Sequence, residues 1–222
     1  MTTRHPIVFD IETGPSPDAA EFAPEFEAPA NYKDPVKIAA YKAEKLTEWV
    51  EQAALSAVTG RVLAIGLREN GVTTIICEDD EAAMLTEFWA FVAPLGKIRA
   101  PLVGFNSNRF DVPFLVRRSW RNRVPVPAGI VNGRYLSNAF IDLMQLWQVG
   151  DYQATVKLDV MARWLGVGAK TGDGAHFAQL LAEDPAAAVA YLANDIEITE
   201  KCAIALGAID APAAVEAGGS DY

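Results

Sequence analysis

The chain of 222 residues contains little cysteine and little histidine, with two of each. The two cysteines, Cys77 and Cys202, exclude a disulfide-rich secreted scaffold, and we expect both to be buried, reduced thiols of a cytoplasmic protein. Long apolar runs are also missing, because no stretch approaches the roughly 18 apolar residues that span a membrane. The apolar run near the N-terminus is too short for a signal peptide, so we expect no membrane partner.

Positive charge is scarce as well. The 29 acidic residues outnumber the 19 basic ones, and the net charge of −10 disfavours a partner as anionic as nucleic acid. Carboxylates that bind divalent cations are neutralised in the working protein, however, although they count as negative in the sequence. Basic residues also gather locally, at Arg61 and Arg68, around Arg109 and in the segment RRSWRNR at 117–123. We therefore expect local, metal-dependent affinity for nucleic acid and no broad basic face.

Apolar residues are abundant, at 51%, and fall into the patterns of short strands and amphipathic helices. Three strands come first, and helices then alternate with two more strands. This order predicts a single α/β domain over residues 1–210, with a mixed central β-sheet flanked by helices. We expect 18–58 to be an insertion between the first two strands whose helix packs back on the core, and 211–222 to be a disordered tail. The predicted strands are 6–13, 61–67, 73–78, 102–104 and 139–141, and the predicted helices are 36–55, 81–92, 110–121, 156–165, 176–182 and 185–207.

The first strand contains two acids that a buried strand rarely carries. Asp10 and Glu12 are two residues apart, so their side chains project from the same face of the strand. Two carboxylates so close repel each other and raise each other's pKa unless a cation lies between them. Oxygen ligands of this kind favour Mg²⁺ or Mn²⁺. The alternative is an exposed edge strand with a polar outer face.

Two further acids follow later in the chain. Asp111 opens a helix after a strand and a loop, where it is either an N-cap or a ligand at the end of a sheet. Asp195 lies four residues after Tyr191 on a helix, so the two share one face. Taken alone, Asp195 could equally face solvent, as we expect for Glu197 and Glu200.

Three segments carry these four acids: one contains Asp10 and Glu12, one contains Asp111, and one contains Asp195. In order and chemistry the three segments resemble the motifs of the DEDD superfamily of 3′–5′ exonucleases. Asp10-Ile11-Glu12 matches its first motif, D-x-E, and Tyr191 to Asp195 matches its third, Y-x-x-x-D. Asn106 to Asp111 is similar to N-x-x-x-F-D, the second motif of the proofreading domains of family B DNA polymerases. The stretches GFNSNRFDVPFL at 104–115 and KLDVMARWLGV at 157–167, followed by KTGDG, also look like that group. Position 190, near where the histidine branch carries its histidine, is alanine, so Tyr191 assigns the chain to the tyrosine branch, together with RNase D.

The resemblance implies an RNase H-like fold and a stand-alone exonuclease without a polymerase domain. It implies two divalent cations, Mg²⁺ or Mn²⁺, held by Asp10, Glu12, Asp111 and Asp195, with Tyr191 orienting the attacking water. The expected reaction releases nucleoside 5′-monophosphates from the 3′ end of a nucleic acid. The candidate substrate contacts are Asn106, Asn108 and Phe110, and the candidate stacking aromatics are Phe105, Phe110, Phe114 and Trp120.

Three alternatives differ in substrate and activity. The polymerase-like second motif favours DNA, with a single strand expected, while an RNase D-like exoribonuclease differs only in acting on RNA. A non-catalytic nucleic-acid-binding protein on the same fold is the third. All four acids and the tyrosine are present, which favours an enzyme. The sequence identifies no protein partner.

Overall fold

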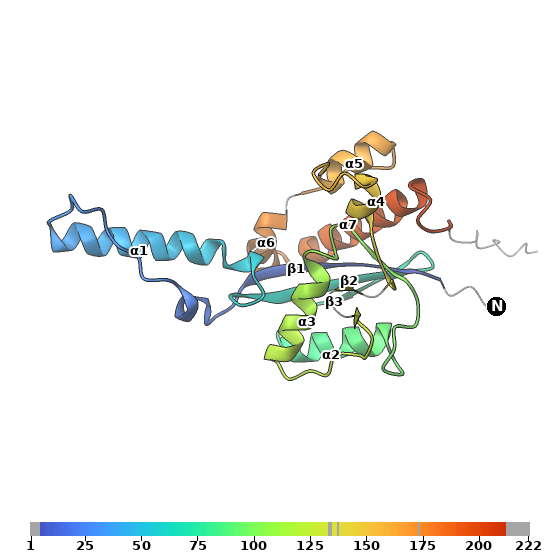
Figure 1. The fold of residues 1–222 in the computed structure, drawn as a ribbon, viewed down its shortest axis with the longest axis horizontal. Coiled ribbons are helices and arrows are strands. Elements are labelled where there is room, and N and C mark those ends of the chain that lie inside the picture. Colours follow the sequence, from blue (N-terminus) through green and yellow to red (C-terminus); the bar gives the residue numbers. More distant parts are fainter. Residues whose placement is uncertain (1–4, 133–134, 137, 173, 212–222) are drawn as a thin grey trace, which may run out of the picture.

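The structure, a computed structural model, describes residues 5–132, 135–136, 138–172 and 174–211. Its centre is a five-stranded mixed sheet (Figure 1). The strands are β1 (Ile7–Pro15), β2 (Gly60–Glu69), β3 (Val72–Ile76), β4 (Leu102–Gly104) and β7 (Phe140–Asp142), in the order β3-β2-β1-β4-β7.

Strand β1 lies in the middle of this sheet, with partners on both sides. It pairs antiparallel with β2 and parallel with β4, while β2 pairs antiparallel with β3 and β4 parallel with β7. The β2–β3 hairpin turns through Asn70 and Gly71, both with positive φ, which suits a two-residue turn. The D-x-E pair therefore belongs to a central strand, and the alternative of an exposed edge strand is wrong.

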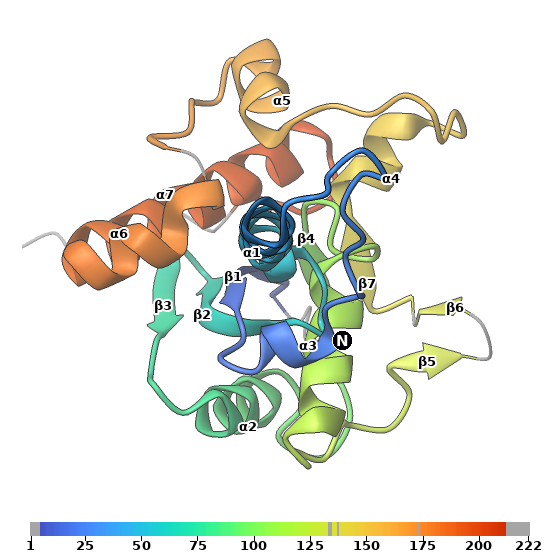
Figure 2. The ribbon, with the colours of Figure 1, turned by 90° about the vertical axis from the view of Figure 1, so that its left-hand side faces the viewer.

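Helices cover both faces of the sheet (Figures 1 and 2). One face is covered by α2 (Glu81–Val92) and α3 (Asp111–Arg121), and the other by α5 (Leu158–Leu165), α6 (Phe177–Glu183) and the long α7 (Pro185–Ala205). Asp80 caps α2 by accepting hydrogen bonds from two backbone N–H groups, and Pro185 begins α7, as expected for helix starts. The smaller elements are 3-10 helices η1 (Ala19–Phe22), η2 (Ala53–Leu55) and η3 (Gly174–His176), helix α4 (Leu143–Gln148), and the strand pair β5 (Val131–Asn132) and β6 (Tyr135–Leu136).

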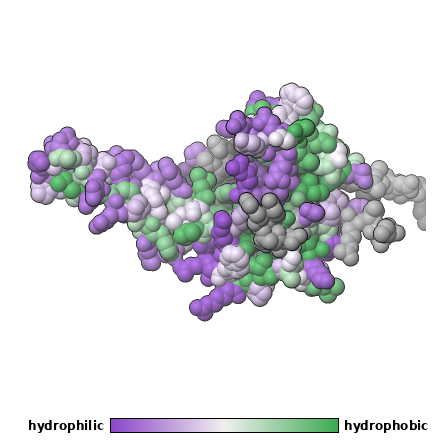
Figure 3. Space-filling view, in the orientation of Figure 1, coloured by the Kyte–Doolittle hydropathy of each residue, from purple (hydrophilic) through white to green (hydrophobic). Residues whose placement is uncertain are grey.

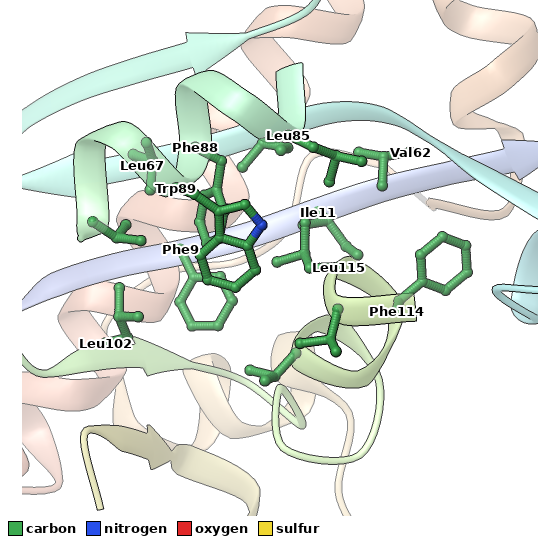
Figure 4. Close-up of a cluster of buried hydrophobic side chains, with 14 of the residues drawn as sticks. Phe9, Ile11, Val62, Leu67, Leu85, Phe88, Trp89, Leu102, Phe114 and Leu115 are labelled. Atoms are coloured by element: carbon green, nitrogen blue, oxygen red, sulfur yellow. The ribbon is translucent and has the colours of Figure 1, made fainter. Parts of the chain in front are cut away.

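The alternation of β1 divides its side chains between two cores. Ile7, Phe9 and Ile11 enter the cluster under α2 and α3, where Phe9 and Phe88 are in ring contact at 6.2 Å (Figure 4). Val8 enters the cluster under α7. Because Asp10 and Glu12 have the same parity as Val8, they too lie on the α7 face.

Helix α1 (Pro35–Glu51) stands away from this body (Figure 1). None of its residues is buried, so the prediction that it packs back on the core is wrong. Its sequence is rich in Lys, Glu and Ala, and the ring of Tyr41 contacts Tyr32 of the preceding segment at 5.9 Å. The apolar pattern correctly predicted a helix over α1. Such a pattern does not indicate, however, whether other parts of the chain pack against the helix.

Other predictions also differ from the structure. Helix α4 and the β5–β6 pair were not predicted, since both are very short. Cys202 is buried as expected, whereas Cys77 follows the end of β3 and is only partly buried. Glu200 is buried and pairs with Arg68 at 2.6 Å, contrary to the exposed position expected for it. Of the predicted tail, residues 212–222 lie outside the described part of the chain. Among the described helices, none has the length and apolarity to cross a membrane.

Candidate active site

Three of the four predicted acids converge on the α7 face of the sheet. Asp10 and Glu12 reach it from β1 and Asp195 reaches it from α7, and one carboxylate oxygen of each lies within 4.8 Å of the others. Asp195 is 1% exposed and Glu12 is 8% exposed, so the alternative of a solvent-facing Asp195 is wrong. Three acids so close, with Glu12 and Asp195 buried and Asp10 half-buried, are costly unless something positive joins them.

The fourth acid, Asp111, lies at the start of α3. Its Oδ1 accepts a hydrogen bond of 3.1 Å from the backbone N–H of Ile11, and its carboxyl interacts with that of Asp10. The cap residue of α3 is Phe110, which makes no side-chain capping bond. Asp111 is therefore tied to β1 across 100 residues of sequence and is no ordinary N-cap.

Burial raises the pKa values of all four acids, and repulsion within the cluster raises those of Asp10, Glu12 and Asp111 further. Burial and the charge of Asp195 raise the pKa of Asp10 to about 7. Burial and the charges of Asp10 and Asp195 raise the pKa of Glu12 to about 9. The pKa of Asp111 is raised well above its ordinary value by burial and by Asp10, and that of Asp195 is raised by burial. Without a cation the cluster thus holds protons near neutral pH.

Lys170 supplies a positive charge that sequence reasoning missed. Its Nζ lies 2.5 Å from Asp195 Oδ2 and 5.3 Å from the centre of the Tyr191 ring. Its backbone N–H donates to Asp159 Oδ1 at 3.0 Å, which fixes the loop that carries it. The only signal in the sequence was the likeness of the KTGDG segment, because a loop lysine has no periodicity that indicates where its side chain lies.

Tyr191 is 6% exposed and lies under a glycine-containing loop. A Cβ at Gly172 would meet its ring at 3.1 Å, and a Cβ at Gly174 would lie 3.3 Å from its hydroxyl and 3.4 Å from Glu12 Oε2. The hydroxyl has no hydrogen bond of good geometry to any described residue. Burial and the charges of Asp195 and Glu12 raise the pKa of Tyr191 above its ordinary value. The phenol is therefore neutral at neutral pH and points at the acid cluster.

Asp142 organises the loop between β4 and α3, a role that the sequence did not indicate. Its carboxylate accepts hydrogen bonds from the backbone N–H groups of Asn106, Asn108 and Met144, at 2.8, 3.0 and 2.9 Å. Asn106 has a φ of 58°, which asparagine tolerates better than most residues. These bonds give Asn106 and Asn108 a structural role in the loop.

A cavity of about 880 Å³ opens beside the acids. Of the candidate substrate residues, Asn106 lines it, whereas Asn108 bonds to Gln145 and Phe110 packs on Phe114 at 5.5 Å. Phe114 is 2% exposed and belongs to the core, so its ring offers no stacking surface. The full lining is Asp10, Phe105, Asn106, Met144, 155–159 and 170–172.

The donor set fits a hard divalent cation. All the converging groups are carboxylates, the donors that Mg²⁺ and Mn²⁺ prefer, and Asp195 Oδ1 has no hydrogen-bond partner among the described residues. A cation there would relieve the repulsion that raises the pKa values. The fold and the site thus define an α/β protein with a carboxylate cluster at its central strand, beside a cavity that Asp10 lines.

Comparison with known proteins identifies the family. The model of a family described as a predicted 3′–5′ exonuclease related to the exonuclease domain of PolB matches residues 53–199, and the chain belongs to this family. The match covers the predicted second and third motifs and begins after the first.

A solved structure agrees with this assignment at the level of the fold. The family B DNA polymerase from the hyperthermophilic archaeon Pyrobaculum calidifontis is similar, with a TM-score of 0.58 and 17% sequence identity. The match covers 90% of this chain and 24% of the polymerase, so the chain spans about a quarter of that protein. The expected RNase H-like α/β fold is confirmed, and no curated protein matches the chain.

Proposed function

We propose that this protein removes nucleotides from the 3′ end of a nucleic acid by metal-dependent hydrolysis of the terminal phosphodiester. The observation that carries the proposal is the convergence of Asp10, Glu12 and Asp195 within 4.8 Å, with Asp111 against Asp10, beside a cavity. Membership of a family of predicted 3′–5′ exonucleases supports the same reaction.

The four acids would hold two divalent cations, Mg²⁺ or Mn²⁺. Asp10, Glu12 and Asp195 would hold one cation, and Asp111 would help Asp10 to hold the other. Divalent cations at such sites lower the pKa of bound water and stabilise the leaving oxygen of a phosphodiester. Because Asp10 and Glu12 retain protons near neutral pH when no cation is present, cation binding releases these protons, and its affinity increases with pH.

Tyr191 orients the attacking water in this proposal. Its hydroxyl lies beside Glu12 and has no hydrogen bond of good geometry to a described residue, so it is available to a water or to substrate. Its raised pKa makes the phenolate inaccessible at neutral pH, which excludes Tyr191 as a general base. The Lys170 ammonium offsets part of the charge of Asp195, Asp10 and Glu12.

The cavity supports a substrate of nucleotide size. Its volume of about 880 Å³ lies within the range of pockets that enclose one drug-sized molecule. Phe105 and Asn106 line it and would contact the terminal base. A single DNA strand is the proposed substrate, on the strength of the polymerase-like second motif, and RNA is the alternative.

The test is digestion of single- and double-stranded DNA and RNA, labelled at either end, with Mg²⁺, Mn²⁺ or EDTA. The expected result is stepwise shortening from the 3′ end, release of nucleoside 5′-monophosphates and no activity in EDTA. Shortening from the 5′ end, or activity that persists in EDTA, would contradict the proposal. Binding of nucleic acid without hydrolysis would favour the non-catalytic alternative.

A further inference from the structure

The outer face of α3 concentrates positive charge in a protein of net charge −10. Arg117 and Arg121 are exposed on the helix, and Arg109 and Arg123 are exposed just beyond its two ends. Arg118 is different, because it is 5% exposed and forms a buried ion pair of 2.6 Å with Glu81. Figure 3 shows hydrophilic side chains projecting at the lower edge of the molecule, where α3 ends.

An aromatic ring lies among these arginines. Arg117, Trp120 and Arg121 are three and four residues apart, so they share one face of the helix. Trp120 is 66% exposed, although burial of such a ring would be favourable. The opposite side of α3 supplies the core with Val112 and Leu115, so Trp120 is not needed there.

Helix α3 begins at the candidate active site. Asp111 is the first residue of the helix, and a rise of about 1.5 Å per residue places Arg117 and Arg121 about 9 and 15 Å further along the axis. A strand whose 3′ end lies at the acids can therefore reach both arginines with nucleotides a short distance upstream.

We propose that the α3 face, consisting of Arg117, Trp120 and Arg121, binds the nucleic-acid strand upstream of the 3′ end. The arginines contact phosphates and the indole stacks on a base, which is the combination that single-strand-binding surfaces use. The inference rests on the proposed function, and it identifies a second contact region outside the catalytic cavity.

One intramolecular contact competes with the strand. The Arg121 guanidinium lies 2.7 Å from Asp18 Oδ2, but the Arg121 side chain is 59% exposed. A surface ion pair of this kind contributes little stability, so a phosphate can replace the carboxylate. Asp18→Asn frees Arg121 without removing a basic group and is expected to tighten strand binding.

The test measures the affinity of a labelled single strand of about 20 nucleotides in EDTA, where no hydrolysis occurs. Arg117→Ala/Arg121→Ala should weaken binding about tenfold, and it should make the plot of log affinity against log salt shallower by about 1.4, the value for two phosphate contacts on a single strand. Trp120→Ala should weaken binding with no change in that slope. Lys97→Ala/Lys201→Ala removes the same charge from other exposed positions and serves as the matched control.

Thermal unfolding of every variant verifies that the fold is retained. Equal affinities and equal salt slopes for the α3 double variant and the lysine control would overturn the inference. The α3 face would then be a candidate surface for binding another protein. A hydrolysis assay with Mn²⁺ separates this failure from failure of the proposed function. If the unsubstituted protein hydrolyses the strand and the α3 double variant binds it as tightly as the lysine control does, only the α3 inference fails. If the α3 double variant loses binding but the unsubstituted protein never hydrolyses the strand, only the proposal of exonuclease activity fails.

Discussion

Asp195 brings the third carboxylate to the pair on β1, from a helix that begins 170 residues after that strand ends. Replacing it with asparagine removes a negative charge and one metal ligand while preserving the size of the side chain. We expect Asp195→Asn to lower nuclease activity at least a hundredfold. The fold should be retained, because the substitution also removes repulsion from Asp10 and Glu12.

The matched control for this prediction is Glu197→Gln on the same helix. The Glu197 carboxylate pairs with Lys201 at 2.7 Å, its side chain is 44% exposed, and it faces away from the cluster. Initial rates on a labelled strand and binding of Mn²⁺ by calorimetry measure both effects. Equal loss of activity in the two variants would remove Asp195 from the metal site.

Tyr191→Phe tests the role of the Tyr191 hydroxyl, because the substitution removes the hydroxyl and keeps the aromatic ring. The ring contacts Phe177 at 6.1 Å and packs under Gly172, so the phenylalanine should keep the local structure. Without the hydroxyl the attacking water is poorly oriented, and we expect kcat to fall about tenfold or more while Mn²⁺ affinity stays within twofold. A variant with unaltered kcat would reject the orienting role.

At the scale of the element, the acids on β1 and the long helices could be predicted because their signals are local. A spacing of two on a strand determines that Asp10 and Glu12 share a face, whatever the rest of the chain does. Lys170 and Asp142 could not be predicted, because each acts through loop geometry that brings distant segments together. Asp111 could be predicted in part. Its motif was recognisable in the sequence, but its hydrogen bond to Ile11 could not be predicted.

Asp142→Ala should loosen the loop that follows β4. The substitution removes the acceptor for Asn106, Asn108 and Met144 and uncaps α4, a loss of about 1–2 kcal/mol for the cap alone. We expect a lower Tm and a higher KM, since Asn106 lines the cavity. Asp151→Ala, in the exposed loop after α4, is the control. A lower Tm without any change in KM would limit Asp142 to a structural role.

Helix α1 and helix α2 should respond differently to the same truncation. Leu46 on α1 is 36% exposed, whereas Leu85 on α2 is 0% exposed and belongs to the core. Leu46→Ala should change the free energy of unfolding by about 0.5 kcal/mol or less, and Leu85→Ala should lower it by about 2–5 kcal/mol. Urea denaturation measures both. A large effect at Leu46 would show that α1 is covered in solution.

At the scale of the whole molecule, stability should depend on pH in an unusual direction. In the cation-free protein the pKa of Asp10 is raised from 3.8 to about 7, and that of Glu12 from 4.5 to about 9. At a pH between the ordinary and the raised pKa of either acid, the folded protein binds more protons than the unfolded chain. The free energy of unfolding therefore falls as the pH rises through this range. This contribution is fully present below about pH 4 and is lost as the pH rises through about 7 and then about 9.

Divalent cations should reverse this loss. In EDTA we expect the Tm to fall between pH 5 and pH 9, and in Mn²⁺ we expect it to hold, because the cation binds the deprotonated acids of the folded state. The difference between the two curves should therefore grow with pH. Asp10→Asn/Glu12→Gln removes the two acids with the titrations named above and should make the EDTA curve shallower. A Tm in EDTA that rises over this range in the unsubstituted protein would mean that the acids do not repel one another, and the carboxylate cluster would then lose its main physical argument for binding metal.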